Sequence, residues 1–442
     1  MITRLFGEEG QGKRLLALVL AVLLSLTIAL MATGCSSSSD DEESDATESE
    51  ESTETTDADN ETYLIGVTTW DPDDPEQVMY FNYLQDYIEA SFNCDFIMSD
   101  ALDSTEDEEA FIEEMKEEGA VGIISLYYTD LEATIDICEE NEMYYVTMGQ
   151  AVTDEEFDAV KDNEYFLGVI GPSTDDEYYV GYNMAEKFIE DGCTSYFISS
   201  GGACYGNTMH LYRTEGMLDA LEEELGITYD ESAEDLAASA EVTEAYSDGT
   251  TNVVIIPGYM DSEDAQADMM QAFEDYDFDA FLGSCTIASV YDDLQDAIKS
   301  ASFDIEVGVV DCFSDENYQA FQMKDSNGES LLDYVAGSYA SMIAPAFIAV
   351  ANAGSGNVDV VKPDGEAFYI TQVGWTAEDV ETFSELYGFT QSTYENAFSA
   401  DDIMSCIYVY NSDANYDDFE VLASSTSTED ALADYASYSE EQ

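Results

Sequence analysis

Short apolar runs alternate with amphipathic helical segments along the chain from Tyr63 onward. The apolar runs are typical of buried strands, and the segments between them carry apolar residues at helical spacing. In the first half, strands are expected at 63–68, 95–98, 121–126 and 144–148, and helices at 78–92, 108–118 and up to Glu140. In the second half, strands are expected at 195–199, 252–257, 280–283 and 305–310, and helices at 177–191, 214–225, 262–276 and 288–300. Such alternation predicts two successive α/β units, each an open parallel sheet with helices on both faces.

The N-terminus is typical of an export signal. Arg4, Lys13 and Arg14 precede an uncharged apolar run over 15–31, and the alternative, a retained membrane-spanning helix, would be at the short limit of length. The segment Ala32-Thr33-Gly34-Cys35 that follows resembles the lipobox of bacterial lipoproteins. We therefore expect a signal peptide over 1–34, cleavage before Cys35 and lipidation of the Cys35 sulfur.

Residues 36–62 have no apolar periodicity and many like charges. Such a segment cannot bury a core, so we expect 35–62 to be an acidic, solvated tether.

Acidic residues outnumber basic ones by 99 to 10, which gives a formal net charge of −89 at pH 7. This balance excludes nucleic acid as a partner, because phosphate binding needs clustered Lys and Arg. It also excludes docking on anionic lipid through a basic patch. Because 45% of the residues are apolar, the chain can still bury large cores with its charge outside.

Five segments occur in the order found in one known family. They are residues 109–125, ending in Gly-Ala-Val-Gly-Ile-Ile-Ser, and the stretches 144–148, 213–217, 279–282 and 308–311. Over about 63–375 the chain thus resembles the sugar-type (ribose-binding-like) periplasmic binding proteins, whose fold is shared by the lactose-repressor core. The resemblance implies two lobes joined by three crossings, near 172–174, 337–341 and 371–374, that close on a small solute by hinge motion.

The same resemblance divides the chain. It implies an N-terminal lobe of 63–173 plus 338–372, a C-terminal lobe of 174–337 plus 373–400, and an extension over 401–442. A helix over 341–353 would return to the first lobe. In the extension we expect an edge strand over 403–410 and a disordered tail from Ser424.

Arg213 is the main ligand-binding candidate, because it is the one arginine after the signal segment and matches the family's ligand-binding arginine. Its guanidinium offers five donors suited to hydroxyls or a carboxylate, although it could instead form an ordinary salt bridge. Asp311 matches the family's second-lobe acid. Ser284 stands in the family's Asn-Asp position, and Tyr259, at a strand end, could stack on a ligand.

The first lobe supplies three further candidates. Trp70 could stack on a sugar ring or belong to a lid. Asp74 could accept hydrogen bonds from hydroxyls or cap a helix. Gln150 takes the place of the family's Asp-Arg pair, so the usual carboxylate clamp is absent.

The resemblance and the lipobox together predict a solute-binding lipoprotein, held outside the cytoplasm on the bacterial membrane, that delivers a small solute to an ABC transporter permease. The negative net charge would repel anions and favours a neutral solute, with cationic solutes left open. The solute would be a sugar or nucleoside, and the protein a monomer without cofactor or metal. Alternatives are a ligand-sensing receptor lobe without transport and a glycoside hydrolase that uses paired carboxylates. The sequence has one His and no G-x-S-x-G motif or phosphate loop, so we predict a binding protein rather than an enzyme. Cys35 aside, seven cysteines remain, which leaves at least one thiol free or paired between chains.

Overall fold

The computed structural model of the protein describes residues 62–300, 305–324, 328, 330–390, 398–424 and 427–441. The predicted signal segment, Cys35 and the tether up to residue 61 lie outside these ranges. Within them, no helix is both long enough and apolar enough to cross a membrane.

The first sheet has six strands in the order β12-β5-β4-β3-β1-β2, and every neighbouring pair is parallel. The strands are β1 (Tyr63–Thr69), β2 (Cys94–Ala101), β3 (Gly122–Ser125), β4 (Tyr144–Met148), β5 (Phe166–Gly171) and β12 (Phe368–Thr371). Their carboxyl ends therefore meet at one edge of the sheet, which is where open α/β sheets bind ligands.

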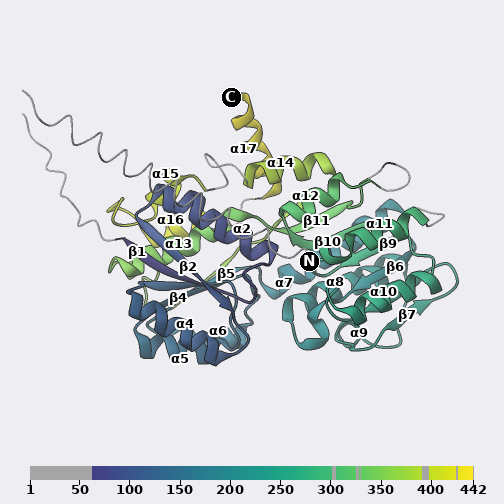
Figure 1. The fold of residues 1–442 in the computed structure, drawn as a ribbon, viewed down its shortest axis with the longest axis horizontal. Coiled ribbons are helices and arrows are strands. Elements are labelled where there is room, and N and C mark those ends of the chain that lie inside the picture. The colour runs from purple at the N-terminus through teal and green to yellow at the C-terminus, as the bar shows by residue number, and fades with distance from the viewer. Residues whose placement is uncertain are drawn as a thin grey trace, which may run out of the picture. The chain divides into compact units, whose positions relative to one another are not determined.

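Helices cover both faces of this sheet (Figure 1). They are α2 (Pro75–Tyr83), which continues through a π-helical turn at Leu84–Ile88 into α3 (Glu89–Ser91), α4 (Thr105–Glu118), α5 (Leu131–Asn141), α6 (Asp154–Val160), α13 (Ala344–Gly354), α15 (Ala400–Ser405) and α16 (Tyr416–Ala423). Several begin where a polar side chain caps the free N–H groups, as Ser104 does for α4 and Asp130 for α5. The helix α13 is buried over residues 344–353, because it packs on β3 and β4 and is itself covered by α15 and α16.

The second sheet has seven strands in the order β13-β11-β10-β9-β6-β8-β7. They are β6 (Ser195–Ser199), β7 (Thr243–Ser247), β8 (Asn252–Ile256), β9 (Ala280–Gly283), β10 (Glu306–Cys312), β11 (Tyr334–Ser338) and β13 (Trp375–Ala377). The outermost strands β7 and β13 are antiparallel to their neighbours, and the inner ones are parallel. The accompanying helices are α7 (Thr174–Asp191), α8 (Thr208–Leu225), α9 (Ala233–Ala237), α10 (Glu263–Asp275), α11 (Tyr291–Ser300), α12 (Asp315–Gln322) and α14 (Val380–Thr390).

The predicted α/β architecture of two lobes joined by three crossings is confirmed. We call the first sheet with its helices the first lobe, and the second sheet with its helices the second lobe. The chain passes between the sheets after β5, after β11 and after β12. Two of these crossings touch, because the ring of Tyr339, just after β11, stacks on Trp375 of β13 with centroids 3.7 Å apart.

One expectation for the extension is wrong. Residues 403–410 do not form an edge strand: Ser399 and Asp402 form a capping box that starts the helix α15, and turns follow it. Further along the extension, Thr428–Glu441 form the helix α17.

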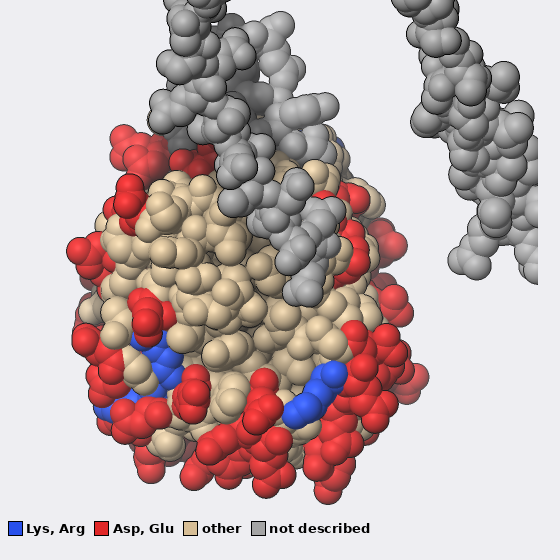
Figure 2. Space-filling model, turned by 90° about the vertical axis from the view of Figure 1, so that its left-hand side faces the viewer, with Lys and Arg blue, Asp and Glu red and all other residues tan. Residues whose placement is uncertain are grey.

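Most acidic side chains lie on the surface. On the face shown in Figure 2, Asp and Glu surround a central area without charged residues. Among the described residues only two acids, Glu108 and Glu177, are fully buried. Glu108 accepts hydrogen bonds from Thr134 and Tyr145, and Glu177 is paired with an arginine, so each has the partners that burial requires.

Candidate functional site

The two long helices α7 and α8 pack closely enough to bring Arg213 against Glu177. A Cβ atom on Gly181 of α7 would lie 1.9 Å from the carbonyl oxygen of Arg213, and a Cβ atom on Gly216 of α8 would lie 2.0 Å from that of Tyr178. Only glycine allows two helix backbones to approach this closely. A glycine in the middle of each helix therefore positions the arginine.

Most of the guanidinium donors of Arg213 are already used. Its Nε and Nη2 atoms donate to the two carboxylate oxygens of Glu177, with 3.0 Å between Nη2 and Oε1. Its Nη1 atom donates to the carbonyl oxygen of Ser284 over 3.0 Å. The side chains of Arg213 and Glu177 are only 15% and 2% exposed. The salt bridge considered from the sequence is thus present, and Glu177 both orients the guanidinium and neutralises it.

The N-terminus of α2 brings two carboxyl groups of the first lobe to the second. Asp74 caps the helix, since its Oδ1 accepts from the backbone N–H groups of Glu76 and Gln77 at 3.0 and 3.1 Å. The capping role considered for Asp74 is therefore present. The carboxyl group of Glu76 hydrogen bonds to Ser338 at the end of β11, and α2 also contacts β10.

Asp311 faces these carboxyl groups from β10. Its Oδ2 accepts a hydrogen bond of 2.8 Å from the side-chain amide of Asn317. Its charge acts on Asp74 and Glu76. Three carboxyl groups from two lobes therefore share one site.

The pKa values of these acids report how little water reaches them. The pKa of Glu76 is raised to about 7, mainly by burial and in part by the neighbouring charges of Asp74 and Asp311, against the opposing effects of Ser338 and Arg213. Burial likewise raises the pKa of Asp74 to about 6. The pKa of Asp311 is raised by burial against its hydrogen bonds to Asn317 and others. Part of this group is protonated near neutral pH, so the site can both donate and accept hydrogen bonds.

Ser284 lies beside the arginine at the end of β9. Its backbone N–H donates to Ser199 over 3.0 Å, and its buried Oγ has no hydrogen-bond partner among the described residues. The thiol of Cys285 and the Nδ1 atom of His210 are close by, around Gly201. Burial lowers the pKa of His210 to about 3, so this histidine is neutral and its Nδ1 accepts from the N–H of Gly202 over 2.9 Å.

Tyr259 belongs to an aromatic pair on the second lobe. Its ring stacks on Tyr205 with centroids 6.1 Å apart, and the two side chains are 39% and 73% exposed. The rings of His210 and Tyr259 form a T-shaped pair with centroids 5.7 Å apart. Tyr127, which follows β3 of the first lobe, is close enough to influence the pKa of Tyr259. The pair therefore faces the end of a first-lobe strand.

Two of the predicted ligand-binding residues lie apart from the three carboxyl groups of Asp74, Glu76 and Asp311. Trp70 directly follows β1 and is 46% exposed, with no hydrogen bond or ring contact to another candidate in the described ranges. The side chain of Gln150 follows β4 and accepts a hydrogen bond of 2.9 Å from the N–H of Tyr128. Gln150 therefore holds the loop after β3, next to Tyr127.

The structure thus brings Asp74, Arg213, Ser284 and Asp311 together, and adds residues that the sequence reasoning missed. These are Glu76, Glu177, Tyr127 and Tyr205. The glycines in the middle of α7 and α8 indicate that these helices pack closely, and this was the sequence signal from which the pairing of Glu177 with Arg213 could have been found.

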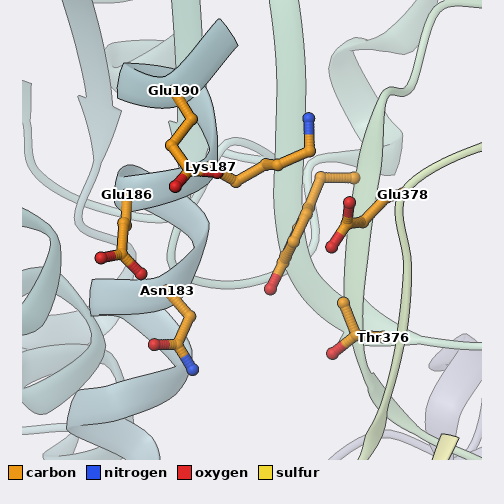
Figure 3. Close-up of a pocket in the computed structure, with 7 residues that line it drawn as sticks. Asn183, Glu186, Lys187, Glu190, Thr376 and Glu378 are labelled. Carbon is orange, nitrogen blue, oxygen red and sulfur yellow. The ribbon is translucent and has the colours of Figure 1, made fainter. Parts of the chain in front are cut away.

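A separate cavity of about 310 Å³ lies in the second lobe (Figure 3). It is lined by Asn183, Glu186, Lys187, Glu190, Tyr334, Thr376 and Glu378. Lys187 is paired with Asp191. None of the seven predicted ligand-binding residues lines this cavity, so it is not the candidate site.

The cysteines form no disulfide among the described residues. All seven from Cys94 to Cys406 are free, and Cys204 is the one that is not fully buried. Over the same ranges no three His, Cys, Asp or Glu side chains are grouped as metal ligands would be.

No protein-family model matches the chain, and no curated protein matches it significantly. Several solved structures, by contrast, align with the chain. A periplasmic sugar-binding protein from Pseudomonas fluorescens aligns with a TM-score of 0.55 at 12% identity, over 79% of this chain and 95% of its own. A galactofuranose-binding protein aligns with a TM-score of 0.52 at 13% identity, over 74% and 98%. The periplasmic component of the arabinose ABC transporter from Shewanella sp. ANA-3, bound to α- and β-L-arabinofuranose, gives 0.51 at 13%, over 74% and 95%.

The fold is therefore that of the type I periplasmic binding proteins, as the sequence predicts. The three structural neighbours named above are binding proteins. At this level of identity the likeness establishes the fold, and the function has to be argued from the site.

Proposed function

We propose that the protein is an extracytoplasmic solute-binding lipoprotein. It captures a small neutral solute, a sugar or a nucleoside-like molecule, by closing its two lobes, and delivers it to the permease of an ABC importer. The observation that carries this proposal is the meeting of Asp74 and Glu76 on one lobe with Asp311 and Ser338 on the other. Polar groups from both lobes at the carboxyl ends of parallel strands are what a closing binding site requires.

The charge of the site favours a neutral solute over an anion. The charge of Arg213 is neutralised by Glu177, so it leaves no excess positive charge for a carboxylate or phosphate. Asp74, Glu76 and Asp311 offer oxygen atoms that accept hydrogen bonds from hydroxyl groups. The remaining Nη1 donor capacity of Arg213 and the unpartnered Oγ of Ser284 would serve the oxygens of a polyol.

The aromatic side chains would complete the site. A sugar ring presents an apolar face, and the stacked rings of Tyr205 and Tyr259 offer a matching surface. Trp70 would cover the ligand from the first lobe, and Gln150 would hold the loop that carries Tyr127.

The periplasmic and transporter neighbours support a place outside the cytoplasm and a transporter partner. Lipidation of Cys35 would anchor the chain to the membrane, and residues 36–62 would let the two lobes reach the permease. The protein would act as a monomer. Radiolabelled fatty acid tests the anchor: we expect incorporation by the full chain and none by Cys35→Ala, and incorporation by both would refute it.

A thermal-shift screen tests the binding function. The chain from Ser36 onward is heated with single monosaccharides, nucleosides and amino acids, because a ligand that binds only the folded state raises the melting temperature. We expect saturable stabilisation by one of the neutral polyhydroxylated solutes. Cleavage of a chromogenic glycoside, with no stabilisation by any solute, would show instead that the protein is a hydrolase.

A further inference from the structure

The chain beyond β13 contacts the two lobes in turn (Figure 1). The helix α14 packs on α12 and β13 of the second lobe, and α15 and α16 pack on α13 of the first. The last helix, α17, returns to α14. After the three crossings, the chain therefore passes between the lobes twice more.

On the first lobe, the attachment is buried and specific. The side chain of Asn352 in α13 donates to the carbonyl oxygen of Cys406 over 2.8 Å and accepts from the N–H of Tyr408 over 2.9 Å. Phe419 of α16 is fully buried and meets Phe368 of β12 edge-on, with ring centroids 5.3 Å apart. The helix α16 is thus fixed beside the strand that leads into the third crossing.

On the second lobe, α17 is attached just past the same crossing. The hydroxyl oxygen of Thr428 accepts a hydrogen bond of 2.9 Å from the backbone N–H of Thr376 in β13. The ring of Tyr435 meets the edge of Phe389, with centroids 6.3 Å apart. Phe389 in turn stacks on Trp375, the residue at which the third crossing ends.

The third crossing and the connection from α16 to α17 are therefore attached at neighbouring points in both lobes. The third crossing joins Phe368 to Thr376, and the passage from α16 to α17 joins the residues attached to them, Phe419 and Thr428. We propose that the helices α16 and α17 act as a splint for the third crossing, which stiffens the hinge and narrows the range of lobe separations. This inference rests on the proposed function only in taking the lobes as hinged bodies.

The short passage explains why the splint would resist opening. Only three residues separate Ser424, at the end of α16, from Thr428, at the start of α17. From Ser424 to Thr428 the chain advances by four residues, which span at most about 14 Å when fully extended. Hinges absorb opening in a few residues at the ends of elements. A connection this short, attached to both lobes beside the third crossing, has to bend when the crossing bends, or one of its attachments has to break.

Distance measurements in the chain from Ser36 onward, without ligand, test the splint. Spin labels on noncanonical residues would replace the exposed Glu109 of α4 and Glu274 of α10, and electron–electron resonance would give the distribution of lobe separations. Truncation after Ser424 removes α17, and Thr428→Val with Tyr435→Ala loosens it at unchanged chain length. We expect both variants to shift the mean separation by several ångströms to longer values and to broaden it.

Tyr276→Ala is the matched control. Tyr276 is also partly buried and also packs on a phenylalanine, Phe278, with centroids 5.6 Å apart, but both rings belong to the second lobe. Its distribution should equal that of the parent. Far-UV circular dichroism verifies folding, and the double variant decides the question if the truncated chain does not fold.

Equal distributions in the parent and the folded double variant would overturn the splint. Because no ligand is present, that result leaves the solute-binding function untouched. A failed solute screen, conversely, leaves the distances interpretable.

Discussion

Replacing Glu76 by glutamine should remove a pH-dependent loss of stability. The carboxyl group of Glu76 is held against Asp74, Ser338 and Asp311, and its pKa is raised from 4.5 to about 7, mainly by burial. A raised pKa means that the folded protein binds a proton more tightly than the unfolded chain. The stabilisation by this proton is complete below about pH 4.5 and is lost as the pH rises through 7.

The size of the loss follows from the two pKa values. They differ by about 2.5, and each pH unit corresponds to about 1.36 kcal/mol, so ionised Glu76 costs roughly 3 kcal/mol at pH 8. Glutamine has nearly the same shape and no charge to desolvate. We expect Glu76→Gln to match the parent at pH 4.5 and to exceed its free energy of unfolding by up to about 3 kcal/mol at pH 8.

Urea unfolding followed by circular dichroism at pH 4.5, 6 and 8 measures this difference. Glu109→Gln, on the exposed face of α4, is the matched control and should leave the pH dependence unchanged. Equal losses of stability in the parent and Glu76→Gln between pH 4.5 and 8 would mean that Glu76 does not lie between the lobes as described.

Three further changes test the site and the hinge. Arg213→Ala leaves Glu177 buried without its partner, so we expect the free energy of unfolding in urea to fall by about 3–5 kcal/mol and the ligand-induced thermal shift to be lost. A stable variant that still responds to ligand would exclude Arg213 from the site. Gly181→Ala places a Cβ atom 1.9 Å from the carbonyl oxygen of Arg213, which should lower the free energy of unfolding by about 1–3 kcal/mol or more and weaken ligand binding measured by calorimetry. Unchanged binding would show that the spacing of α7 and α8 does not position the arginine. Trp375→Ala removes a buried ring stacked 3.7 Å from Tyr339 and should lower the free energy of unfolding by about 3–5 kcal/mol, whereas a loss below about 1 kcal/mol would show that the stack at the crossings contributes little.

Strand positions were predictable from the sequence where apolar runs are long and uninterrupted. The strands at 195–199 and 280–283 have the predicted bounds, because nothing in these runs competes with a buried strand. β5 was missed, and glycines at 168 and 171 interrupt its run. β13 is three residues long, and its position depends on antiparallel pairing with β11, which local patterns do not contain.

The candidate site was predictable as single residues but not as a set of contacts. Asp74 and Asp311 were found by their places in the family resemblance, and Arg213 by its place and as the one arginine after the signal segment. The pairing of Arg213 with Glu177 depends on the spacing of two helices, which is set by Gly181 and Gly216. The place of Glu76 depends on how the first lobe meets the second, and local sequence patterns do not encode such long-range contacts.

Lobe closure on a neutral solute is the central claim, and small-angle X-ray scattering tests it most directly. The chain from Ser36 onward is measured alone and with saturating amounts of the solute that gives the largest thermal shift. We predict a smaller radius of gyration with the solute, with no such change for the variant Asp311→Ala, which lacks one of the facing carboxyl groups. A tightly bound neutral solute that leaves the radius of gyration of the parent unchanged would contradict closure between the lobes.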